Sequence, residues 1–370
     1  MNRSVVVLGL LCIMLAGSAR TCVTSRSRLQ QGPGFIKGAD VSFLDQIEDS
    51  GGVFTEDGVA GDVLEILKDH GFNYIRLRIW HTPSDRYCNL DRTLAMAARI
   101  NDLGLGFLLD LHYSDTWADP GRQTKPAAWT GVSFDDLKDS VYHYTRHVIA
   151  ALDSQNTLPD MVQIGNEVIC GMLWDDGRVC GPFDTPDQWV KFARLVSEGI
   201  RGVRDGMGPG DSIRIMIHID RGGDSAGSQW FFDNLLAHGV YFDVIGLSYY
   251  PWWHGTMDDL RANLEMLAER YDKDIIIAET AYPWTLDWFD NTHNIVGLSE
   301  QLHPGYPASV EGQRQFLIDL IGVIDTTPGN RGRGLFYWSP EYISAPALGS
   351  PWENVTLFDF NGLWHSGSLH

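Results

Sequence analysis

Positive charge is scarce in this sequence. Its 370 residues include 28 lysines and arginines against 48 aspartates and glutamates, which gives a formal net charge of −20. So acidic a surface repels nucleic acid and anionic lipid, and we therefore exclude both as partners. A polyanionic substrate would not be attracted either, so the composition favours a neutral substrate.

Cysteine is also scarce, and the absence of any Cys-x-x-Cys pair argues against a structural zinc site. The five cysteines are Cys12, Cys22, Cys88, Cys170 and Cys180. The last two bracket a short loop that contains glycine and aspartate, and in an oxidising compartment they are expected to form a disulfide. Cys22 and Cys88 have no obvious partner.

Long apolar runs are missing except at the N-terminus. Arg3 precedes the apolar stretch Val5–Ala16, and small residues follow at Gly17–Ala19. This pattern predicts a signal peptide over residues 1–19, because the apolar stretch is too short to span a bilayer comfortably. The protein is therefore expected to be exported to the periplasm, the medium or the cell surface, as a monomer. A lipid anchor at Cys22 is the less favoured alternative.

What the sequence does have is a regular alternation of strand-like and helix-like segments. After a loose segment at 20–34, we expect one domain over 35–365, with strands at 35–41, 74–80, 107–112, 161–166, 213–219, 242–248, 274–278 and 334–338. Amphipathic helices are predicted at 62–70, 90–103, 135–152, 188–203, 229–238, 257–271 and 313–324. Eight strands that alternate with helices indicate a single-domain (β/α)8 TIM barrel. The alternative, an open doubly wound sheet, requires a glycine-rich phosphate turn that Gly38–Phe43 does not supply.

Two of the predicted strands end abruptly in a glutamate, Gln163–Glu167 and Ile275–Glu279. A carboxylate is costly inside a core but useful at the mouth of a barrel, where catalytic groups of this fold lie. Two such carboxylates are the minimum apparatus for cleaving a glycosidic bond. Ordinary strand-end glutamates that pair with arginine are the alternative. An aromatic loop after the second glutamate, with Tyr282, Trp284 and Trp288, favours the catalytic interpretation.

Arg76 and Arg78 lie two residues apart on the second strand and therefore on the same side of it. A buried arginine is rare unless it is paired, so one of them is expected to orient a catalytic carboxylate. A salt bridge between the barrel and a helix is the alternative.

The remaining strand ends are rich in polar and aromatic side chains, which suit sugar hydroxyls and the apolar faces of sugar rings. The candidates for substrate contacts, besides the arginines, are Asn166, His112, Asp115, Trp117, His218, Tyr249, Trp284 and Trp338. Trp338 is expected to form the floor of the pocket. The aromatic run after the sixth strand, from Tyr249 to Trp253, suits a sugar platform, although it could also pack a loop.

Several segments resemble the endo-β-1,4-galactanases of glycoside hydrolase family 53, within the large clan of retaining (β/α)8 glycosidases. The long Asp110–Pro120 motif is the most specific of them. The others are Gly38–Ser42, Ile75–Trp80, Gly165–Glu167, His218–Asp220, Ser248–Pro251, Glu279–Pro283, Trp352–Asn354 and Phe358–Asp359. The resemblance extends from about residue 35 to about residue 360.

The resemblance implies cleavage of internal β-1,4-galactosyl linkages in type I arabinogalactan, the galactan side chains of pectin, with retention of configuration. It implies that Glu167 is the general acid/base and Glu279 the nucleophile. It also implies that Asn166 binds the substrate 2-hydroxyl, and that Tyr249, or less favourably Tyr250, lies near the nucleophile. An arginine and a tyrosine hydroxyl are expected to lower the pKa of Glu279, and a drier setting to keep Glu167 protonated.

Some bacterial relatives bind calcium after the seventh strand, where this chain offers Asp287, Asp290, His293 and Asn294. The ligand types are present but their spacing does not match clearly, so a solvated polar loop is an equal alternative. No other cofactor is expected.

Two further functions remain open at this level. The same catalytic pair would serve an enzyme that acts on mannan, xylan or cellulose. A non-catalytic carbohydrate-binding barrel would keep the aromatic residues but tend to lose a carboxylate, and here both glutamates are present.

Overall fold

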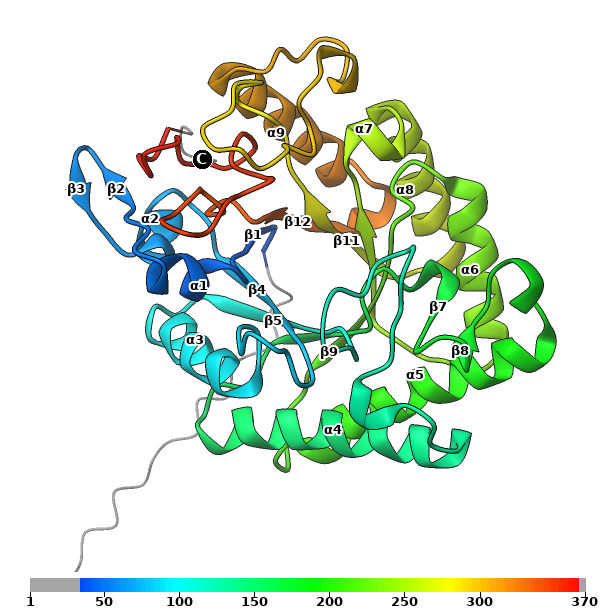
Figure 1. The fold of residues 1–370 in the computed structure, drawn as a ribbon. Helices are drawn as coiled ribbons and strands as arrows, with labels where there is room; N and C mark the ends of the chain where they lie inside the picture. The colour runs from blue at the N-terminus through cyan, green and yellow to red at the C-terminus, as the bar shows by residue number, and fades with distance from the viewer. Residues whose placement is uncertain (1–33, 366–370) are drawn as a thin grey trace, which may run out of the picture. The chain divides into compact units, whose positions relative to one another are not determined.

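The computed structural model describes residues 34–365, and within them the eight predicted strands close into a parallel barrel (Figure 1). Each strand pairs with its two neighbours, in the order β1-β12-β11-β10-β9-β6-β5-β4. The barrel strands are β1 (Ile36–Asp40), β4 (Tyr74–Ile79), β5 (Gly106–Leu111), β6 (Met161–Ile164), β9 (Arg214–Ile219), β10 (Val244–Ser248), β11 (Asp274–Thr280) and β12 (Gly332–Trp338). The predicted TIM barrel is confirmed, and the open doubly wound alternative is wrong.

Helices surround the barrel, as Figure 1 shows. The long ones are α2 (Val63–Asp69), α3 (Leu90–Asp102), α4 (Phe134–Ser154), α5 (Pro186–Gly206), α6 (Ser225–Ala237), α8 (Met257–Tyr271) and α9 (Val310–Asp325). Each begins after a residue whose side chain accepts a backbone N–H of the first turn, namely Asp62, Asn89, Ser133, Thr185, Asp224, Thr256 and Ser309. Such caps fix where a helix begins.

The barrel interior is a packed apolar core, separate from the larger apolar layer between strands and helices. Its buried members are Ile36, Tyr74, Leu108, Met161, Met216, Val244, Ile276, Ala278 and Phe336. A Cβ atom at Gly38 would lie 2.3 Å from the Phe336 ring, so only glycine fits there. This filling closes the interior, so polar chemistry is confined to the carboxyl ends of the strands.

Short elements that the sequence pattern did not predict lie in the connections that follow the strands. They are α1 (Leu44–Asp49), the hairpins β2 (Thr55–Glu56) with β3 (Val59–Ala60) and β7 (Gly171–Met172) with β8 (Gly177–Arg178), and α7 (Pro251–His254). Strands of two residues and helices of four or six residues are too short to leave a recognisable pattern in the sequence.

Two sets of predictions fall partly or wholly outside the described residues. The signal peptide at 1–19, Cys22 and all but the last residue of the loose segment 20–34 lie there. Within residues 34–365, no helix combines the length and the apolar character that crossing a bilayer requires.

Candidate active site

A cavity of about 440 Å³ opens at the carboxyl ends of the barrel strands. Its polar lining is Asp40, Arg76, Arg78, His112, Asp119, Asn166, Glu167 and Glu279, and its aromatic lining is Phe43, Trp117, Tyr250, Trp253, Trp338, Tyr342 and Trp352. A more open hollow of about 580 Å³ lies between the loops after β11 and β12. Among its described lining residues Asp290 is the one acid, so it lacks a carboxylate pair.

Glu279, near the end of β11, is held by a cation and a phenol. Arg76 Nη1 lies 3.0 Å from Glu279 Oε1, and the Tyr250 hydroxyl donates to Oε2 at 3.1 Å. Arg76 is itself 1% exposed and pairs at 2.8 Å with both Asp40 and Asp110. Arg76 is thus the arginine that orients a strand-end carboxylate, as the sequence predicted.

Burial has the largest effect on the pKa of Glu279. It raises this pKa from 4.5 to about 7, although Arg76 and the Tyr250 hydroxyl each lower it. The expected lowering of this pKa by an arginine and a tyrosine hydroxyl is confirmed, but burial outweighs both, because the same barrel mouth that supplies the arginine also removes water from the carboxylate.

Glu167 follows β6 in a left-handed backbone conformation, with φ of +47°. Non-glycine residues adopt this conformation at some energetic cost, and such outliers concentrate at functional sites. The Ser248 hydroxyl hydrogen-bonds Glu167 Oε1 at 2.6 Å. Burial, followed by the charges of Glu279 and Asp220, raises the pKa of Glu167 well above its usual value. The pKa of Glu167 is thus raised, as expected for the general acid, but a drier setting does not distinguish it, because Glu167 is half-buried whereas Glu279 is buried.

Asn166 lines the cavity beside Glu167, and protein groups hold its amide through the oxygen and one Nδ2 hydrogen. Its Oδ1 accepts from Arg76 Nη2 at 2.9 Å and from Gln163 Nε2 at 3.0 Å, and its Nδ2 donates to the Ala118 carbonyl at 2.9 Å. The side chain is thus fixed in one orientation before any substrate arrives. A contact with a sugar hydroxyl stays a prediction.

The two candidate histidines lie in different places. His112 lines the cavity, with its Nε2 2.9 Å from Asp110 Oδ2 and its Nδ1 accepting from Trp80 Nε1 at 3.2 Å. His218 is fully buried and does not line the cavity; it contacts Asn166 and Ser248 instead. Its described contacts make His218 a support for Asn166 and Ser248, and a contact with substrate stays a prediction.

Arg78 also lines the cavity, but it forms no ion pair with any described carboxylate. Its guanidinium lies 4.1 Å from the ring centroid of Phe43 and 4.4 Å from that of Trp117. The alternative of a barrel-to-helix salt bridge is therefore wrong for both arginines. Trp117 and Trp338 both line the cavity, with ring centroids 6.1 Å apart, and the role of Trp338 as its floor stays a prediction.

Tyr249 is not the tyrosine beside Glu279. It is fully buried, its ring lies parallel to Phe316, and its hydroxyl donates to the Gly255 carbonyl at 3.2 Å. Tyr250 lines the cavity, whereas Tyr249 packs against Phe316 of α9.

Trp284 and Asp115 also lie outside the cavity lining. Trp284 packs against Phe360 and His365, each with centroids 4.8 Å apart, so it holds the C-terminal segment to the loop after β11. Asp115 accepts the backbone N–H groups of Thr82 and Ala127, at 2.9 and 2.8 Å. Each side chain supports a loop connection in the structure, and a substrate contact by either stays a prediction.

The candidate calcium ligands do not gather. Asp290 accepts from the Ser344 hydroxyl at 2.5 Å, His293 packs on Trp288, and Asn294 Nδ2 lies 3.5 Å from the Asp287 carbonyl oxygen. Across residues 34–365 no group of three or more His, Cys, Asp or Glu side chains is arranged to hold a metal ion. We therefore derive no step through calcium.

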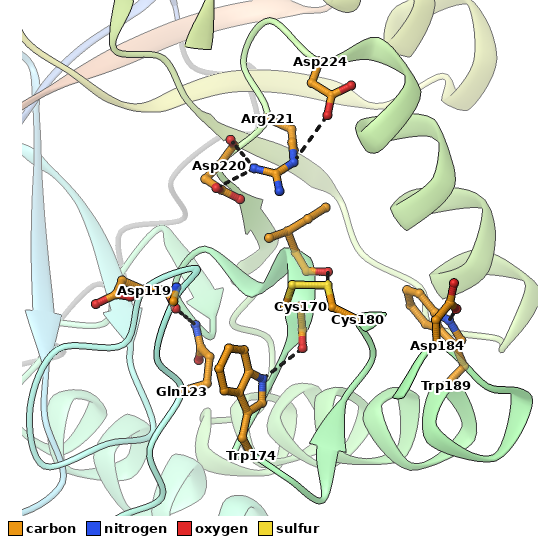
Figure 2. The surroundings of a disulfide bond; sticks show 12 residues. Asp119, Gln123, Cys170, Trp174, Cys180, Asp184, Trp189, Asp220, Arg221 and Asp224 are labelled. Carbon is orange, nitrogen blue, oxygen red and sulfur yellow. Dashed lines mark hydrogen bonds and ion pairs between the residues drawn. A yellow bond between two sulfur atoms is a disulfide. The ribbon is translucent and has the colours of Figure 1, made fainter. Parts of the chain in front are cut away.

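A disulfide joins Cys170 to Cys180, in agreement with the prediction (Figure 2). It closes the β7–β8 hairpin, where Trp174 donates its backbone N–H to the Gln123 carbonyl at 2.8 Å. Gln123 Nε2 donates in turn to the backbone carbonyls of Asp119, at 3.1 Å, and Asn166, at 2.8 Å. The hairpin after β6 thus braces the loop that carries part of the cavity wall. The Cys88 thiol is buried and free.

The sequence analysis missed Asp40, Asp110, Gln163 and Ser248 as members of the site. Arg76 aligns with Asp40 across the β1–β4 pair, and Arg78 aligns with Asp110 across the β4–β5 pair. Acids near the ends of the first and third strands, on either side of an arginine-bearing second strand, were the available signal. Ser248 gave none, because a serine at a strand end is common.

The fold and the site together define a class of protein. An eight-stranded parallel barrel with two glutamates in one cavity at the carboxyl ends of its strands, among aromatic side chains, is the arrangement of enzymes that hydrolyse glycosidic bonds.

Comparison with known proteins narrows this class to one family. Residues 36–367 match the model of the family described as "Glycosyl hydrolase family 53". A Niallia circulans protein named "Uncharacterized protein in bgaB 5'region" is 52% identical over 89% of this chain and 91% of its own. The "Arabinogalactan endo-beta-1,4-galactanase" of Cellvibrio japonicus is 34% identical over 95% of this chain and 92% of its own. The solved "Ignisphaera aggregans GH53 catalytic domain" has a TM-score of 0.84 at 42% identity, covering 89% of this chain and 93% of that one. The chain belongs to glycosyl hydrolase family 53.

Proposed function

We propose that this protein is an exported endo-β-1,4-galactanase that cleaves the galactan of type I arabinogalactan with retention of configuration. The observation that carries the proposal is the contrast between two glutamates in one cavity. Glu279 is paired with Arg76, whereas Glu167 is hydrogen-bonded to neutral Ser248. A retaining glycosidase needs one ionised and one protonated carboxyl group.

In the first step Glu279 attacks the anomeric carbon, and Glu167 donates its proton to the departing glycosidic oxygen. Arg76 favours the ionised form of Glu279, and the Tyr250 hydroxyl orients the attacking carboxylate. The C–O bond to the leaving sugar breaks as the ester to Glu279 forms, and its electrons remain on the protonated leaving oxygen.

In the second step the ester carries no charge, so the like-charge repulsion that raised the pKa of Glu167 is removed. Glu167, now ionised, takes a proton from water as the water oxygen attacks the anomeric carbon. The ester bond breaks, Glu279 regains its negative charge, and both carboxyl groups return to their starting forms.

The substrate assignment is supported by three independent features. The Cellvibrio relative carries the name of a galactanase that acts on arabinogalactan. The net charge of −20 favours a neutral polysaccharide. Trp117 and Trp338 offer rings against which the apolar face of a galactosyl unit would pack.

Reducing-sugar release from purified protein that lacks residues 1–19 tests the proposal. We expect activity on unbranched β-1,4-galactan and none comparable on mannan, xylan or carboxymethyl-cellulose. Chain-length analysis at early times should show internal cleavage. Activity on another of these polymers instead of galactan would overturn the substrate assignment. Binding of galactan without measurable cleavage would favour the non-catalytic alternative. NMR of the first-formed anomer tests retention.

Export is the part of the proposal that rests on residues 1–19. Full-length protein produced in a secreting bacterial host should be recovered from outside the cytoplasm with a mass that lacks this segment. An unprocessed cytoplasmic product would contradict it, and a lipid-modified N-terminal Cys22 would show that the anchor is present.

A further inference from the structure

A chain of buried polar side chains lies behind Glu167. Its Oε1 is 2.6 Å from Ser248 Oγ, Ser248 Oγ is 2.9 Å from His218 Nε2, and His218 Nδ1 is 3.0 Å from Asn166 Oδ1. Ser248 and His218 are fully buried, on the neighbouring strands β10 and β9. The proposed reaction gives neither of them a role.

The partners of Asn166 determine which nitrogen of His218 carries hydrogen. Asn166 Oδ1 lies 2.9 Å from Arg76 Nη2, which can only donate, and Asn166 Nδ2 lies 2.9 Å from the Ala118 carbonyl, which can only accept. The amide therefore presents its oxygen to His218. His218 Nδ1 must carry the hydrogen, and in a neutral imidazole Nε2 is then an acceptor facing Ser248.

His218 is held neutral by its surroundings. Burial lowers its pKa well below the usual value, and the charge of Arg76, followed by those that His112 and His254 would carry, lowers it further. No ion pair between His218 and a carboxylate occurs among the described residues. Protonation of Nε2 is thus disfavoured, and Nε2 depends on the Ser248 hydroxyl for a hydrogen bond.

We propose that the Ser248 hydroxyl is a two-way switch that donates to His218 Nε2 while Glu167 is protonated and to Glu167 while it is ionised. A hydroxyl has one proton, and here two acceptors compete for it. This inference rests on the proposed role of Glu167 as acid and base. When the Glu167 O–H bond breaks and its proton passes to the leaving-group oxygen, the electron pair stays on the carboxylate. Ser248 then turns toward that carboxylate.

The consequence is that His218 favours the acid form of Glu167. Each time Glu167 is ionised, the Ser248 proton is drawn away and His218 Nε2 is left buried without a donor, which is energetically costly. Deglycosylation returns the proton to Glu167, and Ser248 turns back. Ser248 and His218 are thus positioning residues, because they act through Glu167.

Other charges that face Glu167 act in addition to this chain. Glu279 on β11 and Asp220 after β9 raise the pKa of Glu167, Arg76 on β4 lowers it, and Tyr250 after β10 lies beside Glu279. A change at His218 replaces none of these residues. A shift in the pKa of Glu167 in that variant therefore reports the hydrogen bonds through Ser248 and His218.

The high-pH limb of kcat/KM on β-1,4-galactan tests the switch, because it reports the essential acid of the free enzyme. His218→Asn keeps an amide donor for Asn166 and removes the Nε2 acceptor, and we expect the limb to move down by about one pH unit. In a Ser248→Ala background the same change should produce no further shift. Equal shifts in both backgrounds, or none in the first, would overturn the switch.

The matched control is His238→Asn, at the end of α6, where the ring stacks on Trp189 away from the cavity. It should leave the limb in place. If the wild type fails to cleave galactan, or if Glu167→Gln retains the high-pH limb, the proposed function fails instead.

A measurement on the wild-type protein tests the proposed hydrogen-bond pattern at His218 without any variant. Nitrogen-15 NMR of the histidine rings should show His218 neutral, with hydrogen on Nδ1 and not on Nε2, from about pH 5 to about pH 8. Hydrogen on Nε2, or an imidazolium in this range, would overturn the switch whatever the enzyme acts on.

Discussion

The two glutamates of the cavity lie at the ends of strands of the same barrel, yet their surroundings are opposite in kind. Glu279 contacts a guanidinium and a phenol, and through Arg76 it joins the buried carboxylates Asp40 and Asp110. Glu167 contacts the neutral hydroxyl of Ser248, and the negative charges of Glu279 and Asp220 raise its pKa. One side chain type therefore meets a cationic environment on one side of the cavity and a neutral one on the other.

This difference assigns the roles more firmly than the position of either residue. Burial raises the pKa of both carboxyl groups, and Arg76 opposes the rise in both, but among the two glutamates it forms a direct ion pair with Glu279 alone, at 3.0 Å. Pairs of acids whose environments separate their pKa values divide into a proton donor and a nucleophile. Substitution of either glutamate, or of the residues that contact it, tests whether the two environments differ in this way.

The largest effect is expected for Glu279→Gln, which removes the nucleophile and leaves the shape nearly unchanged. Activity on galactan should fall by at least about 10⁴-fold, because an amide cannot form the ester. Steady-state kinetics measures this, with exposed Glu265→Gln on α8 as a control that should match the wild type. A variant that kept a tenth of the activity would exclude Glu279 as nucleophile.

Arg76→Met should cost about 3–5 kcal/mol in the free energy of unfolding, because it leaves buried carboxylates without their cation. Urea denaturation measures this loss. The control is Arg99→Met, whose partly exposed pairs with Glu48 and Asp62 should contribute no more than about 1 kcal/mol. Similar losses in the two variants would show that the cationic environment of Glu279 is not specially stabilising.

Two neighbouring tyrosines sharpen the same comparison. Tyr250→Phe removes the hydrogen bond to Glu279 and should lower kcat/KM by about 10- to 100-fold. Tyr249→Phe removes a bond to the Gly255 carbonyl and should leave kcat/KM within about twofold, at a stability cost of about 1 kcal/mol. The reverse order would restore the original assignment of Tyr249.

The smallest effect concerns stability and pH. The pKa of Glu279 is about 7 in the folded protein against an ordinary 4.5, so the folded state binds this proton more tightly. Its contribution to stability is complete below pH 4.5 and declines as the pH rises toward 7. The difference in unfolding free energy between wild type and Glu279→Gln should fall over that interval. A rising difference would mean that attraction to Arg76 outweighs burial.

Much of the fold could be predicted because strong periodic signals decide it. The seven long helices show an amphipathic period and the eight barrel strands are apolar runs, and their ends agree with prediction to within a few residues. The hairpins of two-residue strands and the short helix α7 have no such signal. Their positions depend on contacts between loops, such as the bridge between Thr124 and Trp174.

In the site, the sequence predicted those residues whose role follows from their type and their position at a strand end. Glu167, Glu279, Arg76 and Asn166 follow from charge or amide groups at strand ends. The direction of a side chain beyond the strand end determines that Tyr250, and not Tyr249, lines the cavity. It also determines that Trp284 lies outside the cavity. Alternation no longer applies there, so the sequence left those orientations undetermined.

The most direct test of the contrast between the two glutamates uses a substrate that needs no acid. On an aryl β-galactobioside with a highly acidic leaving group, Glu167→Ala should form the glycosyl-enzyme almost as fast as the wild type, although it loses about 10²–10⁴-fold on galactan. Added azide should then give a β-galactobiosyl azide. Glu279→Ala should be inactive on both substrates. A Glu279→Ala variant that cleaves the aryl substrate, with Glu167→Ala inactive on it, would reverse the two roles and contradict the account.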